Sequence, residues 1–553
     1  MLRYLLIILI IISNIGFGQL NHAFSIDNAK RDDGNLYLWV YFKDKGQSLK
    51  KVHLSDKTIA RRKRNNPEKD ISWYDLDPPA NYIESILNTG ATLRGQSRWF
   101  NAISIICNED QLSEMSLLPF VKEISPLAQY QRTIISELSV DRILDKSFTL
   151  SEADYGSSFD QLEQINIPAV HDAGYYGNGI SILVLDSGYN LDHPVFDSLN
   201  VIAEWDVIND DSTTKNEDGQ DIGSQQNHGT SVLSIMGGYT KGTLIGPAFK
   251  SDYILAKTEV IGSETSIEED YFVLGLEWGE ARGADIVTTS VGYIDWYTPE
   301  NMDGNTALIT KAYDIAAGLG VLCIAAAGNE NGNYWDTVTP PADADSVISV
   351  GAVNNEGIIT YFSSRGPTVD GRTKPEVCAW GDDTYLAVGS ISYRTGDGTS
   401  YAAPLVAGAA ALVMEAHPDW PSMIVRKAIM QTASQSNSPD EIYGWGIMDT
   451  WAAINYDTSS LFIPELNQNF PNPFNPNTTI KYELRQSSNV KLVVFDILGR
   501  EVKTLVNRFE PSGIKSVKWN GITNSGFLAS TGVYFYSLII NDNRYTKKML
   551  LIK

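Results

Sequence analysis

Residues 180–186 read Ile-Ser-Ile-Leu-Val-Leu-Asp, a nearly unbroken apolar run that ends in an acid. A run this short and apolar is typical of a strand buried on both faces, which occurs in parallel sheets covered by helices. Similar runs recur with helical segments between them, at Tyr253–Lys257, Asp285–Thr289, Val321–Ala325 and Val347–Val350. Residues 151–457 therefore predict an α/β domain with a parallel sheet flanked by helices.

A smaller unit is predicted before this domain. Residues 19–130 mix alternating strands with short helical patterns, which indicates an α+β unit. Its predicted elements are a strand at Leu36–Phe42, a helix at Asn81–Asn88, a strand at Ala102–Cys107 and a helix at Glu109–Leu118. Residues 131–150 are expected to link it to the α/β domain.

The C-terminal part changes to an all-β pattern. Residues 458–478 contain a proline- and asparagine-rich run that predicts a linker, because proline cannot donate to a sheet. Residues 479–553 predict a β-sandwich, from alternating runs separated by turns that contain glycine or asparagine. Those runs are Thr479–Leu484, Val490–Asp496, Ile514–Trp519, Val533–Ile540 and Tyr545–Ile552.

The N-terminus and the charge limit the cell compartment and the partners. Arg3 precedes an apolar run, and small residues follow before Gln19, so residues 1–18 are expected to be a signal peptide. The net charge of -24 disfavours nucleic acid and anionic membranes as partners, and no run is long enough to predict a membrane span.

Three cysteines are too few for a disulfide framework. The basic run Arg61–Arg64 is expected to be a solvated helix face rather than a processing site.

Two candidate catalytic residues lie early in the α/β domain. Asp186 ends the strand at 180–186, and ligands of open α/β sheets bind beyond the carboxyl ends of strands. By itself an aspartate there is more often a turn residue. His228 starts a helical, apolar run after an acidic loop, and its imidazole has the pKa range that a general base needs.

Two more candidates follow later in the chain. Ser400 precedes a helical run, Leu405–Met414, that is apolar on nearly every side and therefore predicted to be buried. A serine at a helix start is commonly an N-cap, but free N–H groups there also stabilise an oxyanion. Asn329 closes a turn after the strand at 321–325, and its amide is a candidate second oxyanion donor.

The order Asp, His, Asn, Ser within one α/β domain resembles the subtilisin-like serine peptidase family, over residues 150–455. The segment 362–367, Phe-Ser-Ser-Arg-Gly-Pro, resembles the same family. The resemblance implies a catalytic triad and an oxyanion donor, together with a cleft lined by two short segments. The implied residues are Asp186, His228 and Ser400 for the triad, Asn329 for the oxyanion, and Ser290, Val291, Gly292 and Gly328 for the cleft.

The flanking units also resemble known modules. Residues 19–130, through the segments 97–104 and 118–121, resemble the inhibitory propeptides of this family, with an unrelated α+β module as the alternative. The C-terminal unit, with its segment 470–475, resembles the sorting domain of proteins that Bacteroidetes export by the type IX system. The alternative there is a carbohydrate-binding or adhesive sandwich. The resemblance implies export through the periplasm to the medium or the outer-membrane surface.

We therefore expect a secreted serine endopeptidase that hydrolyses polypeptides and has its own propeptide as an intramolecular inhibitor. Its chemistry needs no cofactor. A catalytically silent surface scaffold is the alternative, and an α/β-hydrolase esterase is disfavoured because Asp precedes His and Ser. A structural calcium ion on the acidic loop is less favoured than a solvated loop, because the spacing matches no known ligand set. The acidic residues are Asp210, Asp211, Glu217, Asp218 and Asp221.

Overall fold

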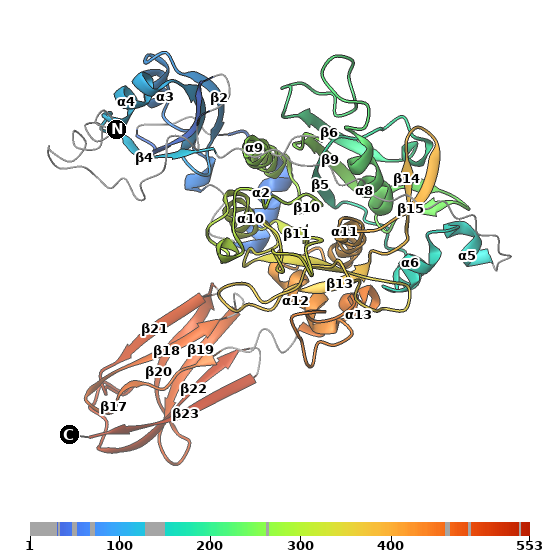
Figure 1. Ribbon diagram of the computed structural model, residues 1–553. Coiled ribbons are helices and arrows are strands. Elements are labelled where there is room, and N and C mark those ends of the chain that lie inside the picture. Colours follow the sequence, from blue (N-terminus) through green and yellow to red (C-terminus); the bar gives the residue numbers. More distant parts are fainter. Residues whose placement is uncertain are drawn as a thin grey trace. The chain divides into compact units, whose positions relative to one another are not determined.

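The computed structural model describes most of the chain, which forms two compact units, Met1–Asn455 and Tyr456–Lys553 (Figure 1). The predicted signal peptide and nearly all of the predicted linker at 131–150 lie outside the described residues. The described residues are 30, 34–46, 52–66, 72–127, 150–261, 265–458, 465–484, 488–511, 513–540 and 543–552.

The first unit is built on a seven-stranded sheet in which every neighbouring pair is parallel. This confirms the predicted α/β class, and all five predicted strands are present. In spatial order the strands are β13 (Val377–Trp380), β12 (Val347–Val353), β11 (Leu322–Ala326), β10 (Ile286–Thr289), β5 (Ser181–Asp186), β9 (Asp252–Lys257) and β6 (Asn200–Asp206).

Two pairs of helices cover the sheet. Along β5, Ile182 and Val184 belong to the hydrophobic cluster that includes α8 (Asn227–Gly237) and α11 (Thr399–Ala416). Leu183 and Leu185 belong to the cluster of α9 (Ile267–Arg282) and α10 (Leu308–Gly318) on the other face. Because successive side chains of a strand point to opposite faces, an apolar run is what burial on both faces requires.

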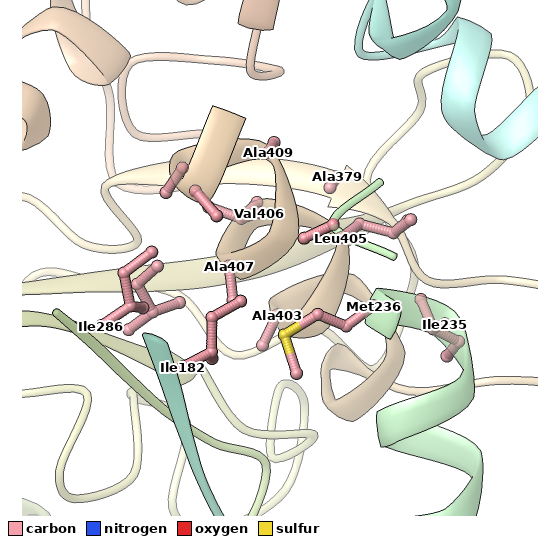
Figure 2. Packing of buried hydrophobic residues seen from close by; sticks show 14 of the residues in the cluster. Ile182, Ile235, Met236, Ile286, Ala379, Ala403, Leu405, Val406, Ala407 and Ala409 are labelled. Carbon is pink, nitrogen blue, oxygen red and sulfur yellow. The ribbon is translucent and has the colours of Figure 1, made fainter. Parts of the chain in front are cut away.

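Helix α11 runs through the middle of the first cluster. In Figure 2 its Ala403 and Ala407 lie towards Ile182 and Ile286 of the sheet, with Met236 of α8 alongside. Small side chains bring the helix close to its neighbours: a Cβ on Gly408 would be 2.4 Å from Pro247. Among the described residues α11 alone is long and apolar enough to cross a membrane, but 83% of it is buried inside the unit.

The three cysteines of the chain are buried as free thiols. Shorter helices and strands complete this part of the unit. The helices are α5 (Leu150–Tyr155), α6 (Phe159–Glu163), α7 (Ile167–Asp172), α12 (Ser422–Thr432), α13 (Thr450–Ile454), and the 3₁₀ turns η3 (Pro194–Phe196) and η4 (Pro299–Asn301). The strands are β7 (Tyr239–Thr240), β8 (Leu244–Ile245), β14 (Thr384–Val388) and β15 (Ser392–Gly396).

Residues 34–127 form the predicted α+β part of the same unit. A four-stranded sheet in the order β2-β3-β1-β4 covers its own small core against α3 and α4. The other face of this sheet contacts α9: the Trp39 indole donates to Asp270 at 2.5 Å, and the Ser104 hydroxyl donates to the same carboxylate at 2.5 Å. The elements are β1 (Leu36–Phe42), α2 (Asp56–Asn65), η2 (Trp73–Asp75), α3 (Ala80–Leu87), β2 (Thr92–Ser97), β3 (Ala102–Cys107), α4 (Glu109–Ser116) and β4 (Val121–Pro126).

The prediction of a solvated face for the basic run was wrong. Arg61 is 1% exposed and Arg62 is 3% exposed, and both guanidinium groups pair with the buried Glu280 of α9. A charge run is buried when carboxylates on a neighbouring element neutralise it, and the sequence of α2 alone does not contain those carboxylates.

The C-terminal unit is an antiparallel β domain around one core, apart from a single parallel pairing of Phe474 with Leu551. Part of the predicted linker belongs to it: Phe470–Asn475 forms β17, and Phe474 is 1% exposed. Pairing of β17 with β18 is interrupted between Phe470 and Asn475, so the prolines there need not donate. The strands are β16 (Glu465–Leu466), β17, β18 (Asn477–Leu484), β19 (Ser488–Phe495), β20 (Glu501–Glu510), β21 (Gly513–Trp519), β22 (Gly532–Ile540) and β23 (Asn543–Leu551).

Candidate active site

The candidate residues lie at the carboxyl ends of three adjacent strands. After β5 the chain adds β6 and β9 on one side of β5, then crosses over to add β10 and β11 on the other. The switch point between β5 and β10 is where an open α/β sheet forms a crevice. Asp186 is the last residue of β5, Ser290 follows β10, and Asn329 follows β11.

Asp186 and His228 are in direct contact, as the sequence led us to expect. The Asp186 side chain is fully buried, and its Oδ1 lies 2.8 Å from His228 Nδ1. The same Oδ1 accepts from the backbone N of Ser187 at 2.7 Å and from its hydroxyl at 3.1 Å. His228 lies in the first turn of α8, and 21% of its side chain is exposed. Asp186 therefore holds the Nδ1 edge of the ring, while part of the ring remains accessible to solvent.

Ser400 lies in the first turn of α11, where backbone N–H groups have no partner within the helix. Its hydroxyl donates to the carbonyl oxygen of Ser290 at 3.0 Å, and the Ser290 hydroxyl donates to the carbonyl oxygen of Ser400 at 2.8 Å. This reciprocal pair joins the end of β10 to the start of α11. The adjacent Tyr401 ring lies 6.1 Å from the His228 ring, which brings the histidine to the same helix start.

Two hydrogen-bond donors lie close to Gly398. A Cβ added to Gly398 would be 3.7 Å from Asn329 Nδ2 and 3.7 Å from the backbone N of Ser400. Gly398 has φ +149°, which other residues rarely adopt, so the space stays open. An amide N–H₂ and a helix-terminal N–H this close together are suited to an oxygen that gains negative charge.

The Asn329 amide is held by residues that the sequence reasoning did not single out. Its Oδ1 accepts from the backbone N and the hydroxyl of Thr399, each at 3.0 Å. This fixes Oδ1 toward α11 and leaves Nδ2 directed to the space at Gly398. Ser364, within the segment 362–367, supports the same loop, because its backbone N donates to Gly328 at 2.9 Å. Ser364 lies in segment 362–367, which resembles the family, and Thr399 directly precedes Ser400. These positions are the signals that could have found them.

The predicted cleft segments share a neighbour. A Cβ on Gly292 would be 2.7 Å from Thr339 Oγ1, and a Cβ on Gly328 would be 2.7 Å from Thr339 Cγ2. Both glycines therefore keep backbone close to Thr339. Ser290 is buried, Val291 is partly exposed and Gly292 is exposed, so the segment emerges from the sheet onto the surface beside Ser400.

The acidic loop before α8 is organised by a lysine. Lys257, at the end of β9, is 1% exposed, and its ammonium lies 2.7 Å from Asp206 and 2.5 Å from Asp221. Burial alone would lower the pKa of Lys257, but the bonds to the two carboxylates outweigh it and the pKa is raised. No group of three or more metal-ligating side chains occurs among the described residues. The Lys257 ammonium thus supplies a positive charge between Asp206 and Asp221.

Comparison with known families agrees with this geometry. Residues 177–446 match the subtilase family. Residues 37–165 match the peptidase S8 propeptide domain of Bacteroidota, and residues 468–553 match a secretion system C-terminal sorting domain. The propeptide match extends beyond the predicted boundary at 130 into the start of the α/β domain.

Individual relatives cover the same region. Subtilisin of Bacillus pumilus is 33% identical over 294 residues, which is 53% of this chain and 97% of that protein. Subtilisin E of Bacillus subtilis (strain 168) is 32% identical over 53% of this chain and 70% of its own length. The solved structure of the prenylagaramide maturation protease PagA aligns with a TM-score of 0.43 at 22% identity, over 52% of this chain and 97% of that one. The chain belongs to the subtilase family and is a subtilisin-like serine endopeptidase with a propeptide domain and a C-terminal sorting domain.

Proposed function

We propose that the protein hydrolyses peptide bonds through a triad of Asp186, His228 and Ser400 and an acyl-enzyme intermediate. The observation that carries the proposal is that Asn329 Nδ2 and the Ser400 backbone N both lie 3.7 Å from the Cβ position of Gly398, together with the direct contact between His228 and the buried Asp186. A histidine base held by a buried carboxylate, together with a nucleophile at an oxyanion site, is the arrangement that acyl transfer requires.

The proposed reaction begins when the Ser400 hydroxyl turns from the Ser290 carbonyl towards His228. His228 Nε2 takes the proton while Ser400 Oγ bonds to the scissile carbonyl carbon. The carbonyl oxygen becomes an oxyanion that accepts from Asn329 Nδ2 and the Ser400 N–H. Asp186 accepts from Nδ1, which fixes the tautomer and stabilises the imidazolium.

Collapse of this intermediate breaks the C–N bond, and the imidazolium gives its proton to the leaving amine. A water molecule then attacks the acyl-enzyme, with His228 again as base, and releases the new carboxyl group and Ser400. The substrate backbone would lie along Ser290, Val291, Gly292 and Gly328, where the two glycines leave room for it. No step draws on a metal or an organic cofactor.

The propeptide domain and the C-terminal domain are proposed to control when the enzyme becomes active and where it is exported. The propeptide domain would inhibit the peptidase until it is cut away between about 130 and 155. The C-terminal domain would direct export by the type IX machinery, through the periplasm to the medium or the outer-membrane surface, and would itself then be removed. These roles are supported by the family matches of the two units.

The test is the Ser400→Ala variant. The wild-type enzyme should hydrolyse unfolded protein and be labelled by a serine-directed phosphonate, and the variant should lose both properties, because Ser400 is the proposed nucleophile. Asn333→Ala, on the loop after Asn329, is a control that should keep both. If the wild-type protein neither cleaves nor reacts, the silent surface scaffold becomes the better description.

A further inference from the structure

Helix α2 contains several positively charged residues that take no part in the proposed triad or cleft. It begins after Ser55, whose side chain caps Thr58 N, and it contains Arg61, Arg62 and Arg64. Figure 1 shows α2, in blue, beside α9 and α10 of the peptidase, away from the rest of the propeptide sheet. The helix therefore adds a contact with the peptidase beyond the one that the propeptide sheet makes with α9.

The first part of this contact covers the C-terminal end of α9. Backbone carbonyls at a helix end have no partner within the helix and carry partial negative charge. Here Ser55 N donates to the Ala281 carbonyl at 2.9 Å, and the Thr58 hydroxyl lies 2.9 Å from the Glu280 carbonyl and 3.0 Å from that of Ala281. Arg61 donates to the Ala284 carbonyl just beyond the helix. The start of α2 thus caps α9 from another domain.

The second part is a buried network of charges. Arg61 and Arg62 pair with Glu280, and Arg62 also pairs with Asp75 of the propeptide at 2.6 Å. Arg98 of the propeptide reaches Asp75, Glu277 and Glu280 at 3.4–3.6 Å. Three cations and three carboxylates balance one another in the complex. On separation the propeptide would retain a net charge of +2 from this network, and α9 would retain -2.

The third part lies at the base of the sheet. Lys57 donates to Ser181, the first residue of β5, at 2.6 Å, and pairs with Asp285 before β10 at 3.1 Å. Arg64 pairs with the same Asp285 at 3.2 Å. Asn65 accepts from the backbone N of Ser422 at the start of α12. Asp186 lies at the opposite end of β5, about 16 Å away at the rise of a parallel strand, so this surface is remote from the candidate active site.

We infer that residues 52–66 are a second docking element of the propeptide, bound at the base of the peptidase sheet. This element sets how long the propeptide stays on the enzyme, because two linked contacts must open together before the propeptide can leave. It also shields the Arg61–Arg64 run, which becomes accessible to a basic-specific protease only after α2 has left this surface. This role rests on the proposed function in one respect: the propeptide must dissociate from the peptidase.

The experiment uses the full chain with Ser400→Ala, so that binding is measured without turnover. A site for a sequence-specific protease is inserted between residues 131 and 149, the chain is immobilised by its C-terminus and cut, and loss of the propeptide is followed as loss of mass. Arg62→Gln removes one of the three cations that neutralise the buried carboxylates Asp75, Glu277 and Glu280, and it should speed release by about 100-fold or more. Lys30→Gln, an equal charge change at an exposed ion pair with Glu109 inside the propeptide, should leave the rate within about 2-fold.

A second variant and a second measurement cover the case in which Arg62→Gln does not fold. Arg64 is 18% exposed and sits at the edge of the contact, so Arg64→Gln should speed release by only about 3- to 10-fold. Trypsin should cut after Arg61, Arg62 or Arg64 only after release, and the uncut chain should resist. Wild-type release rates in both variants, or rapid trypsin cleavage at this run in the uncut chain, would overturn the inference. Both outcomes are measured in the Ser400→Ala chain, so neither depends on peptidase activity.

Discussion

Replacing Asn329 by alanine tests the proposed oxyanion site directly. The substitution removes Nδ2, one of the two donors that face the space at Gly398, and leaves the Ser400 N–H in place. It also removes the acceptor of two bonds from Thr399. Asn329 is exposed, so water can replace those bonds and the free energy of unfolding should fall by only about 1 kcal/mol.

The effect on catalysis should be much larger than the effect on stability. A donor aimed at the oxyanion acts mainly in the transition state, and loss of one such donor costs about 2.7–4 kcal/mol, or roughly 100- to 1000-fold in kcat. KM should change little, because the substrate carbonyl in the ground state gains little from this donor. The Asp186–His228 pair is untouched, so the shape of the pH profile should be retained.

Thr399→Val provides a graded version of the same test. Valine keeps the volume of the side chain but removes the hydroxyl that donates to Asn329 Oδ1, while the backbone N keeps its own bond. Thr399 acts as a positioning residue, and its loss should lower kcat by about 2- to 10-fold with KM unchanged, the value of one hydrogen bond. Thr399→Ser should restore most of the rate.

The assay is steady-state hydrolysis of a chromogenic peptide by the mature enzyme, with the amount of active enzyme set by phosphonate titration. Asn333→Ala is the control for removal of an amide from the same loop, and it should keep both parameters within about 2-fold. A raised KM with unchanged kcat for Asn329→Ala would show that Asn329 is only a turn residue, and the oxyanion assignment would fail.

Three further predictions concern stability and export. Lys257→Met should lower the free energy of unfolding by about 3–5 kcal/mol at pH 7, because Asp206 and Asp221 are left facing each other, and thermal melting should show the loss shrinking toward acid pH. Burial lowers the pKa of His171 to about 4; the unfolded chain then takes up the proton first as pH falls below about 6.5, so the Ser400→Ala protein should lose about 2 kcal/mol by pH 5, and His171→Gln should flatten this loss in urea titrations. Deleting residues 467–553 should leave purified peptidase activity intact and trap the protein in the periplasm of its own host; fractionation that finds normal export would favour an adhesive sandwich.

Several features of this protein could be predicted from residue pattern alone. Short apolar runs such as 180–186 are typical of strands buried on both faces, and they predict a parallel sheet with the acid at its carboxyl edge. The helix after Ser400 is apolar all round, so it had to be internal. These are local consequences of side-chain chemistry, and the sheet and α11 agree with them.

Other features depended on partners far away in the chain. Prolines in 470–475 suggested a linker, yet β17 is an ordered strand, because its pairing skips the residues that cannot donate and Phe474 finds a core to fill. The direction of the Asn329 amide depends on Thr399, 70 residues later. No local pattern specifies such a bond.

The basic run at Arg61–Arg64 shows the difference most clearly. A run of cations without partners is expected to be exposed to solvent, because burying each charge costs several kcal/mol. Glu280 and Asp285, more than 200 residues away, change that outcome by placing carboxylates opposite Arg61, Arg62 and Arg64. The sequence by itself determined the strands, the buried helix and the types of the candidate catalytic residues. Only the tertiary structure decided which charges meet, because the energy of a buried charge depends on the partner that the fold brings to it.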